Sequence, residues 1–181
     1  MRTDTEVRTT ARRRTAAVAV AVAVMAVAGT LLTAPPAEAA PRGADPQQRI
    51  EAIADRTGFD WRAVGGEFVV GCAPSTVQAR CTMGAYVTSE RRMYVSPRAF
   101  ATTALLEYVV LHELAHLWQF TASPPELRVG VLAPFGFSGL HALEVGADCL
   151  ARHLGARFPG HYGCPEEALP VVGALYAATV G

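Results

Sequence analysis

An unbroken helical pattern of hydrophobic residues runs from Arg98 to about Phe120. Apolar side chains recur at three- and four-residue spacings on more than one side, which is typical of a helix that is buried by its neighbours. In front of this segment, Ser96 and Pro97 supply a capping side chain and a first-turn proline, a combination that starts many helices. The pattern therefore predicts a buried helix over residues 98–120.

Shorter patterns predict the other elements of a mixed helix and strand domain. Asp45 and Ser138 are expected to cap the helices that follow them. Three segments rich in β-branched and aromatic residues are expected to be strands, the last two as a hairpin: 67–70, 85–88 and 93–95. The remaining expected elements are a helix from Pro46 that stops at Gly58, a structured loop over 121–138, a helix over 139–154 and a helical tail over 165–180.

The first 39 residues have the three parts of an export signal. Arginines, among them Arg13 and Arg14, precede an apolar run over residues 16–32 and the small-x-small cleavage site Ala37-Glu38-Ala39. That run is 17 residues long and alanine-rich, which is short and weakly hydrophobic for a membrane span. We expect cleavage near Ala40, a secreted product and no stable membrane insertion after cleavage. An uncleaved, membrane-tethered form is the alternative.

Charge and cysteine content indicate which partners and which covalent cross-links to expect. From residue 40 onward 11 arginines stand against 13 acidic residues, a balance of 11 − 13 = −2, and the arginines are scattered. A nucleic-acid partner is therefore not expected. The four cysteines also lie in this part, and an even number in an exported protein favours disulfides. Three pairings are possible, of which Cys72–Cys81 and Cys149–Cys164 close the shortest loops; no C-x-x-C spacing suggests a cysteine zinc site.

The segment His112-Glu113-Leu114-Ala115-His116 is an HExxH motif inside the predicted buried helix. A spacing of four residues puts both imidazoles on one helix face, where they can bind the same ion. Glu113 beside them can take a proton from a metal-bound water, whose pKa the metal lowers. Without a metal, two core histidines would lie beside a lone buried carboxylate, which is costly. We therefore expect one Zn²⁺ at this position.

Two carboxylates follow on the next predicted helix. Glu144 and Asp148 are again four residues apart and share a face. One can serve as the third metal ligand, while the other orients a histidine by accepting its second N–H. On a helix considered alone, two solvated carboxylates would be the ordinary interpretation. Next to an HExxH helix, the ligand role is favoured.

The two motifs together, His112-Glu113-x-x-His116 and Glu144-x-x-x-Asp148, resemble the gluzincins, the thermolysin-like zinc peptidases. The resemblance covers roughly residues 85–155 and implies an α+β, zincin-like fold, with a small β-sheet packed on the HExxH helix and a second helix carrying the glutamate ligand. It implies Glu144 as the third ligand and Asp148 as the partner of a zinc histidine. It also implies an edge strand that holds the peptide substrate, and Met93-Tyr94-Val95 resembles that strand.

The sequence also differs from the gluzincins in ways that change the expected domain organisation. Ala122 excludes the metzincin pattern, which needs a histidine there, and 37 residues follow Glu144 (181 − 144), too few for the large C-terminal domain of thermolysin. A minimal, single-domain form is expected, with residues 1–39 as signal, 40–60 as linker and helix, and 61–181 as the metallopeptidase domain. The transition-state histidine of the family is then missing, and His161, Tyr162 and His141 are the candidates for the oxyanion or the cleft.

The expected function is secreted, zinc-dependent hydrolysis of peptide or protein substrates by metal-activated water. Phe135 and Phe137 are candidates for a substrate pocket, whereas His153 is expected at the surface. The alternative is an exported, non-catalytic zinc-binding protein. The intact Glu113 argues against that alternative, because a site that does not turn over has no need of a base.

Overall fold

A computed structural model describes residues 44–74, 81–125 and 127–180. The predicted export signal over residues 1–39 lies outside the described residues. The described part is α+β, with five α-helices, two short 3-10 helices and one three-stranded sheet. In chain order the elements are α1 (Pro46–Asp55), β1 (Glu67–Val70), β2 (Gly84–Val87), β3 (Arg92–Val95), η1 (Pro97–Ala101), α2 (Thr103–Thr121), α3 (Leu127–Gly130), η2 (Ala133–Phe135), α4 (Gly139–His153) and α5 (Leu169–Val180).

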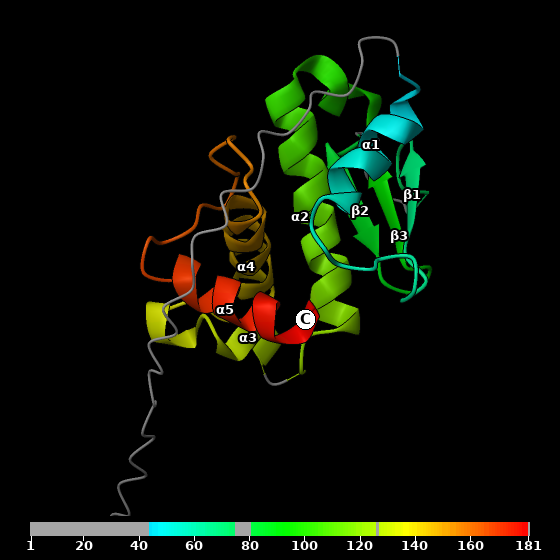
Figure 1. Cartoon of the computed structure of the whole chain (residues 1–181). Helices are drawn as coiled ribbons and strands as arrows, with labels where there is room; N and C mark the ends of the chain where they lie inside the picture. The colour runs from blue at the N-terminus through cyan, green and yellow to red at the C-terminus, as the bar shows by residue number, and fades with distance from the viewer. Residues whose placement is uncertain (1–43, 75–80, 126, 181) are drawn as a thin grey trace, which may run out of the picture. The chain divides into compact units, whose positions relative to one another are not determined.

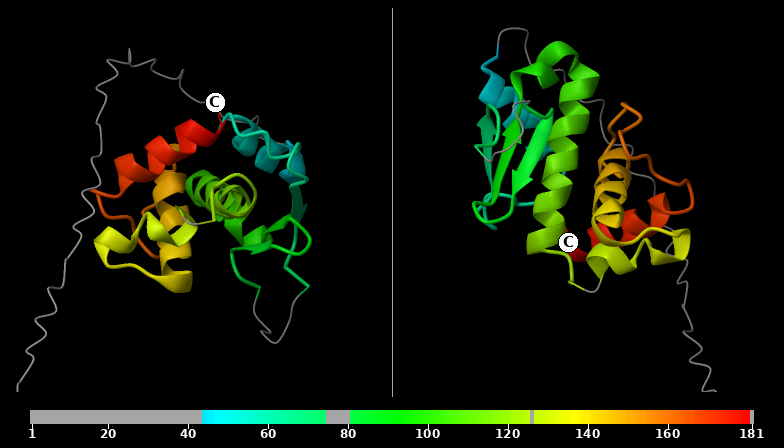
Figure 2. Two further views of the ribbon diagram at one scale, coloured as in Figure 1. Left: turned by 90° about the horizontal axis from the view of Figure 1, so that it is seen from below. Right: turned by 180° about the vertical axis from the view of Figure 1, so that it is seen from behind.

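Helix α2 lies between the sheet on one side and helix α4 on the other (Figures 1 and 2). Every residue of the segment 108–119 is buried, polar ones included. This burial on all sides is what the hydrophobic pattern of the segment predicts. Helix α5 covers α4 and is joined to α2 by a hydrogen bond of 2.8 Å from Trp118 Nε1 to Thr179 Oγ1.

The start of α2 differs from the prediction of an unbroken helix over 98–120. The capping signal at Ser96 opens the 3-10 helix η1, where the Ser96 hydroxyl accepts a hydrogen bond from the Arg98 N–H. Thr102 then adopts an extended conformation (φ −139°, ψ 156°), and its hydroxyl accepts the Leu105 N–H at 3.1 Å. A second cap therefore follows the first after six residues (102 − 96), so α2 begins at Thr103.

The sheet is mixed, with strand order β1-β3-β2. β2 and β3 form the predicted antiparallel hairpin, although β2 begins one residue earlier than expected, at Gly84. β1 pairs in parallel with the other edge of β3. The expectation that 93–95 is the edge strand is therefore wrong, because β3 is central and β2 takes the edge. Met93 and Val95 are accordingly fully buried.

The segment between α2 and α4, predicted as a structured loop, contains two short helices, α3 and η2. Ser138 precedes α4 in the expected cap position, but its side chain makes no capping hydrogen bond. Gly58, expected to stop the first helix, has φ +77°, a left-handed conformation that glycine adopts without strain. The helical tail is confirmed as α5, which begins four residues after the predicted start.

Both expected disulfides, Cys72–Cys81 and Cys149–Cys164, are present. Two disulfides fit an extracellular protein, because reducing compartments keep thiols free. Among the described residues no single helix is long and apolar enough to cross a bilayer; one bent pair, Leu127–Phe135 with Gly139–His153, meets that test by length and composition only.

Removal of the Thr102 hydroxyl tests the second cap. Thr102→Ala is expected to lower the free energy of unfolding by about 1 kcal/mol, since the Leu105 N–H loses its acceptor. Urea unfolding of the metal-free protein measures the change. Thr103→Ala, an exposed change in the first turn of the same helix, is the control and is expected to change stability by less. Equal effects of the two substitutions would contradict the cap.

Candidate metal centre

Helices α2 and α4 face each other and bring three predicted ligands to one point. His112 Nε2 lies 3.2 Å from Glu144 Oε2, and His116 Nε2 lies 3.4 Å from the same oxygen. Both imidazoles are buried, while the Glu144 side chain is 32% exposed. The structure therefore brings together His112, His116 and Glu144, which were predicted as ligands from two separate helices.

The spacing of the three donor atoms fits a metal ion. Ligands about 2.1 Å from a tetrahedral ion lie about 3.4 Å from one another. Glu144 Oε2 lies 3.2 and 3.4 Å from the two histidine nitrogens, and all three donor atoms lie within 4.8 Å of one another. Two imidazoles and a carboxylate are also a donor set that divalent metals accept. The group of His112, His116 and Glu144 could hold a metal ion, with its exposed side toward solvent.

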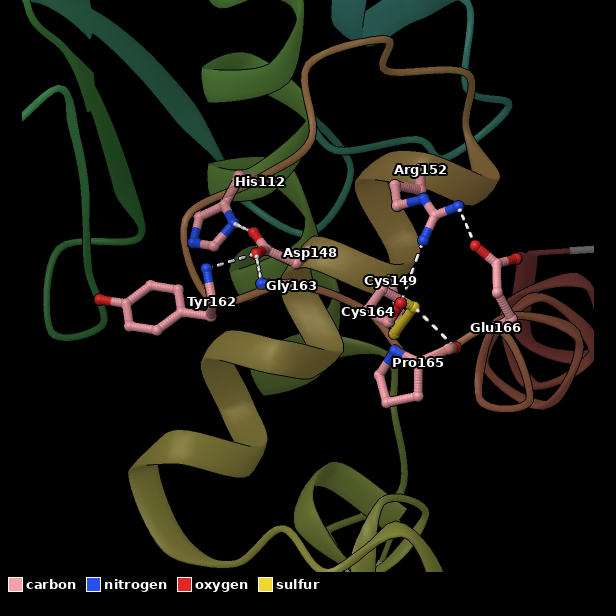
Figure 3. The surroundings of a disulfide bond; sticks show 9 residues. All are labelled: His112, Asp148, Cys149, Arg152, Tyr162, Gly163, Cys164, Pro165 and Glu166. Carbon is pink, nitrogen blue, oxygen red and sulfur yellow. Dashed lines mark hydrogen bonds and ion pairs between the residues drawn. A yellow bond between two sulfur atoms is a disulfide. The ribbon is translucent and has the colours of Figure 1, made fainter.

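Behind His112 lies the fully buried carboxylate of Asp148, which accepts four hydrogen bonds. Figure 3 draws those from His112, Tyr162 and Gly163. One oxygen accepts from His112 Nδ1 at 2.9 Å and from the Tyr108 hydroxyl at 2.7 Å. The other accepts from the backbone N–H groups of Tyr162 and Gly163, both at 2.8 Å. Burial alone would raise the pKa of Asp148, but the hydrogen bonds from His112 and Tyr108 hold it below its usual range.

The two carboxylates on either side of the His112 ring, Asp148 and Glu144, are hydrogen-bond acceptors, so positive charge is required between His112 and Glu144. Asp148 can only accept, so Nδ1 of His112 carries a proton and the Nε2 lone pair of the neutral ring faces the Glu144 carboxylate. Burial opposes the charged imidazole, yet hydrogen bonds to Asp148 and Glu144 raise the pKa of His112 to about 10. Hydrogen bonds to His112 and His116 likewise hold the pKa of Glu144 well below its usual range. A second proton or a metal ion satisfies this arrangement.

Glu113 lies beside the metal group and against the sheet. The residue is 6% exposed. Burial raises the pKa of its carboxyl, while the nearby His112 and His116 oppose that rise. A raised carboxyl pKa moves the group toward the range useful for a general base at neutral pH. The neighbouring residue on β2 is Gly84, where an added Cβ would lie 2.8 Å from Glu113 Cγ and closer still to its carboxylate.

A cleft of about 800 Å³ opens over these residues. Its lining includes His112, Glu113, His116 and Glu144, together with residues 82–86 of the β2 strand and its approach and the candidates His161 and Tyr162. Among the described residues the lining contains neither His141 nor the predicted pocket residues Phe135 and Phe137, which pack partly buried against the core. The His141 ring contacts those of Phe137 and Tyr162, at centroid distances of 5.3 and 6.2 Å. His153 is exposed, as predicted, and its ring lies beside Tyr176 of α5.

The loop that carries His161 and Tyr162 is fastened to the centre at several points. The Cys149–Cys164 disulfide joins it to α4 one residue after Asp148 (Figure 3). The His161 N–H donates to the Tyr108 hydroxyl at 3.1 Å. Gly160 has φ +84°, and a Cβ there would lie 2.8 Å from Asp148 Cγ. The loop can approach the buried carboxylate this closely only with glycine at position 160.

Sequence reasoning missed three residues of the centre: Tyr108, Gln119 and Gly84. Tyr108 lies four residues before His112 and Gln119 three residues after His116, so both share the histidine face of α2. Extending the helical period in both directions from the motif would have found them. Gly84 carries no comparable signal, because its role depends on a tertiary contact with Glu113.

Comparisons with known protein families, with curated protein sequences and with solved structures find no match to this chain. The resemblance to gluzincins therefore rests on the two motifs alone. What the chain does has to be inferred from the chemistry of the site.

Loss of the Cys149–Cys164 disulfide is expected to weaken metal binding, since the loop it fastens supplies two of the four hydrogen bonds to Asp148. For the double variant C149A/C164A we expect an affinity lower by about tenfold or more, as for other losses around a metal ligand. Metal titration against a competing chelator, below the unfolding temperature, measures it. The control is C72A/C81A, which removes a disulfide that closes a loop before β2. If both double variants bind metal equally well, the loop does not support the centre.

Proposed function

We propose that the protein is an exported zinc-dependent peptidase of the gluzincin type, in a zincin-like fold. The observation that carries the proposal is the convergence of His112, His116 and Glu144, with the buried Glu113 beside them. Three protein ligands with one exposed side are typical of catalytic zinc, which keeps a position for water. The two disulfides and the signal-like N-terminus support export.

In the proposed mechanism each residue has a distinct task. A bound zinc ion would supply Lewis acidity, lowering the pKa of a water molecule and polarising the scissile carbonyl. Glu113 accepts the proton of the attacking water and passes it to the leaving nitrogen. Asp148 keeps the proton of His112 on Nδ1, so that Nε2 stays available as a ligand atom. His161 and Tyr162, on the cleft lining, are the candidates for stabilising the oxyanion.

The cleft suits an extended peptide. β2 is the edge strand, and its residues line the cleft beside Glu113. An edge strand offers unpaired N–H and C=O groups to which a substrate backbone can add. Peptide or protein substrates held along β2 would pass their scissile bond over the metal group. The non-catalytic alternative has no use for a base placed between that strand and the ligands.

Replacement of the base separates catalysis from metal binding. Glu113→Gln is expected to keep about one zinc per chain and to lower the rate of peptide cleavage by roughly 10²- to 10⁴-fold, because the amide cannot accept the proton. Metal analysis and digestion of a peptide library measure both. Glu107→Gln is the control on the same helix, since Glu107 pairs with Arg56 away from the cleft. Wild-type protein without zinc, or an E113Q variant that cuts as fast as wild type, refutes the proposal.

The contact between β2 and the base gives a second test. Gly84→Ala places a methyl group against the Glu113 side chain, which has little room to move because it is buried. We expect kcat to fall by about tenfold or more while zinc content stays unchanged, since displacement of a catalytic group by about 1 Å has effects of this order. Gly130→Ala, where an added Cβ meets nothing within 4 Å, is the control. An unchanged kcat in G84A would show that catalysis does not depend on the position in which Gly84 leaves the Glu113 side chain.

A further inference from the structure

Gln119 is a buried amide, 2% exposed, on α2 one turn after His116. Its side chain spans the interface between the two helices of the metal centre. Gln119 Oε1 lies 2.9 Å from His116 Nδ1, and Gln119 Nε2 donates to the Leu143 carbonyl on α4 at 3.0 Å. Leu143 immediately precedes the ligand Glu144. One side chain thus contacts a metal ligand on its own helix and the turn that carries another.

These contacts fix which atoms carry protons. A backbone carbonyl can only accept a hydrogen bond, so the amide nitrogen of Gln119 must face Leu143. The amide oxygen then faces His116 and requires a proton on its Nδ1. The Nε2 lone pair of the neutral His116 ring is left pointing toward Glu144, 3.4 Å away. The Leu143 carbonyl therefore determines the tautomer of His116 through Gln119.

Gly146 provides an independent sign that the fold makes room for this amide. It lies in the interior of α4, where glycine costs about 1 kcal/mol relative to alanine. A Cβ at this position would lie 2.8 Å from Gln119 Nε2. Glycine at a buried helix-interior position lets the amide reach the Leu143 carbonyl.

We propose that Gln119 is a positioning residue for the metal: it holds His116 in the Nδ1–H tautomer and ties α2 to the ligand-bearing turn of α4. The proposal rests on the proposed function in one respect: a divalent ion must bind His112, His116 and Glu144. The two histidines then have unlike partners, the charged Asp148 for His112 and the neutral Gln119 for His116. With Gln119 in place, both Nε2 atoms are aimed before an ion arrives.

Gln119→Met tests the proposal, because methionine has a similar length but neither the donor nor the acceptor. The dissociation constant for zinc, measured by chelator competition, is expected to rise about 10- to 100-fold. Nitrogen NMR of the metal-free protein, in mildly alkaline buffer where ordinary imidazoles are neutral, is expected to show loss of the single Nδ1–H form of His116. Gln119→Glu keeps the acceptor for His116 but places an oxygen in front of the Leu143 carbonyl, so it is expected to retain the tautomer while losing part of the affinity.

Thr179→Val is the matched control, since it also removes one partly buried hydrogen-bond partner of α2, the acceptor of Trp118 Nε1, but away from the metal ligands. Its zinc affinity is expected to stay within about twofold of wild type. A Q119M variant that keeps both the wild-type affinity and the His116 tautomer overturns the proposal. If wild-type protein binds no zinc, the proposed function fails, yet the tautomer in the metal-free protein still decides the role of Gln119.

Discussion

The buried carboxylate of Asp148 accepts hydrogen bonds from a metal-ligand candidate, a tyrosine hydroxyl and two backbone amides of a distant loop. A charge with no exposed surface is costly unless its oxygens are fully paired. The four donors come from α2 and from the loop before Cys164, so Asp148 stays satisfied only while both remain in place. The geometry of His112 and the position of the cleft wall therefore depend on the same group.

The net charge of the candidate metal centre also depends on its buried carboxylates. Three carboxylates, those of Glu113, Glu144 and Asp148, lie around the imidazoles of His112 and His116. Neutral imidazoles leave this group with excess negative charge in a largely buried place. A divalent cation offsets most of this negative charge and can use the two Nε2 lone pairs, which face Glu144. The electrostatics of the centre thus favour a cation on the side where the cleft opens.

Most of the local structure could be predicted from the sequence, because it depends on spacing. The i, i+4 spacing placed His112 with His116 on one face and Glu144 with Asp148 on another, and short loops identified both disulfides. The exchange of edge and central strands could not be predicted, since it depends on the parallel pairing of β1 with β3, two strands far apart in sequence. The start of α2 was misplaced because the Ser96 signal caps η1 and Thr102 supplies a second cap.

The Cys149–Cys164 bond also affects how the protein matures after synthesis. A newly made chain with free thiols must hold the loop of residues 160–163 by hydrogen bonds alone. Thiols remain reduced where glutathione and thioredoxin act, and pair where the surroundings are oxidising. In the exported protein proposed above, the covalent fastening of this loop would therefore form only after the chain leaves the reducing place of synthesis.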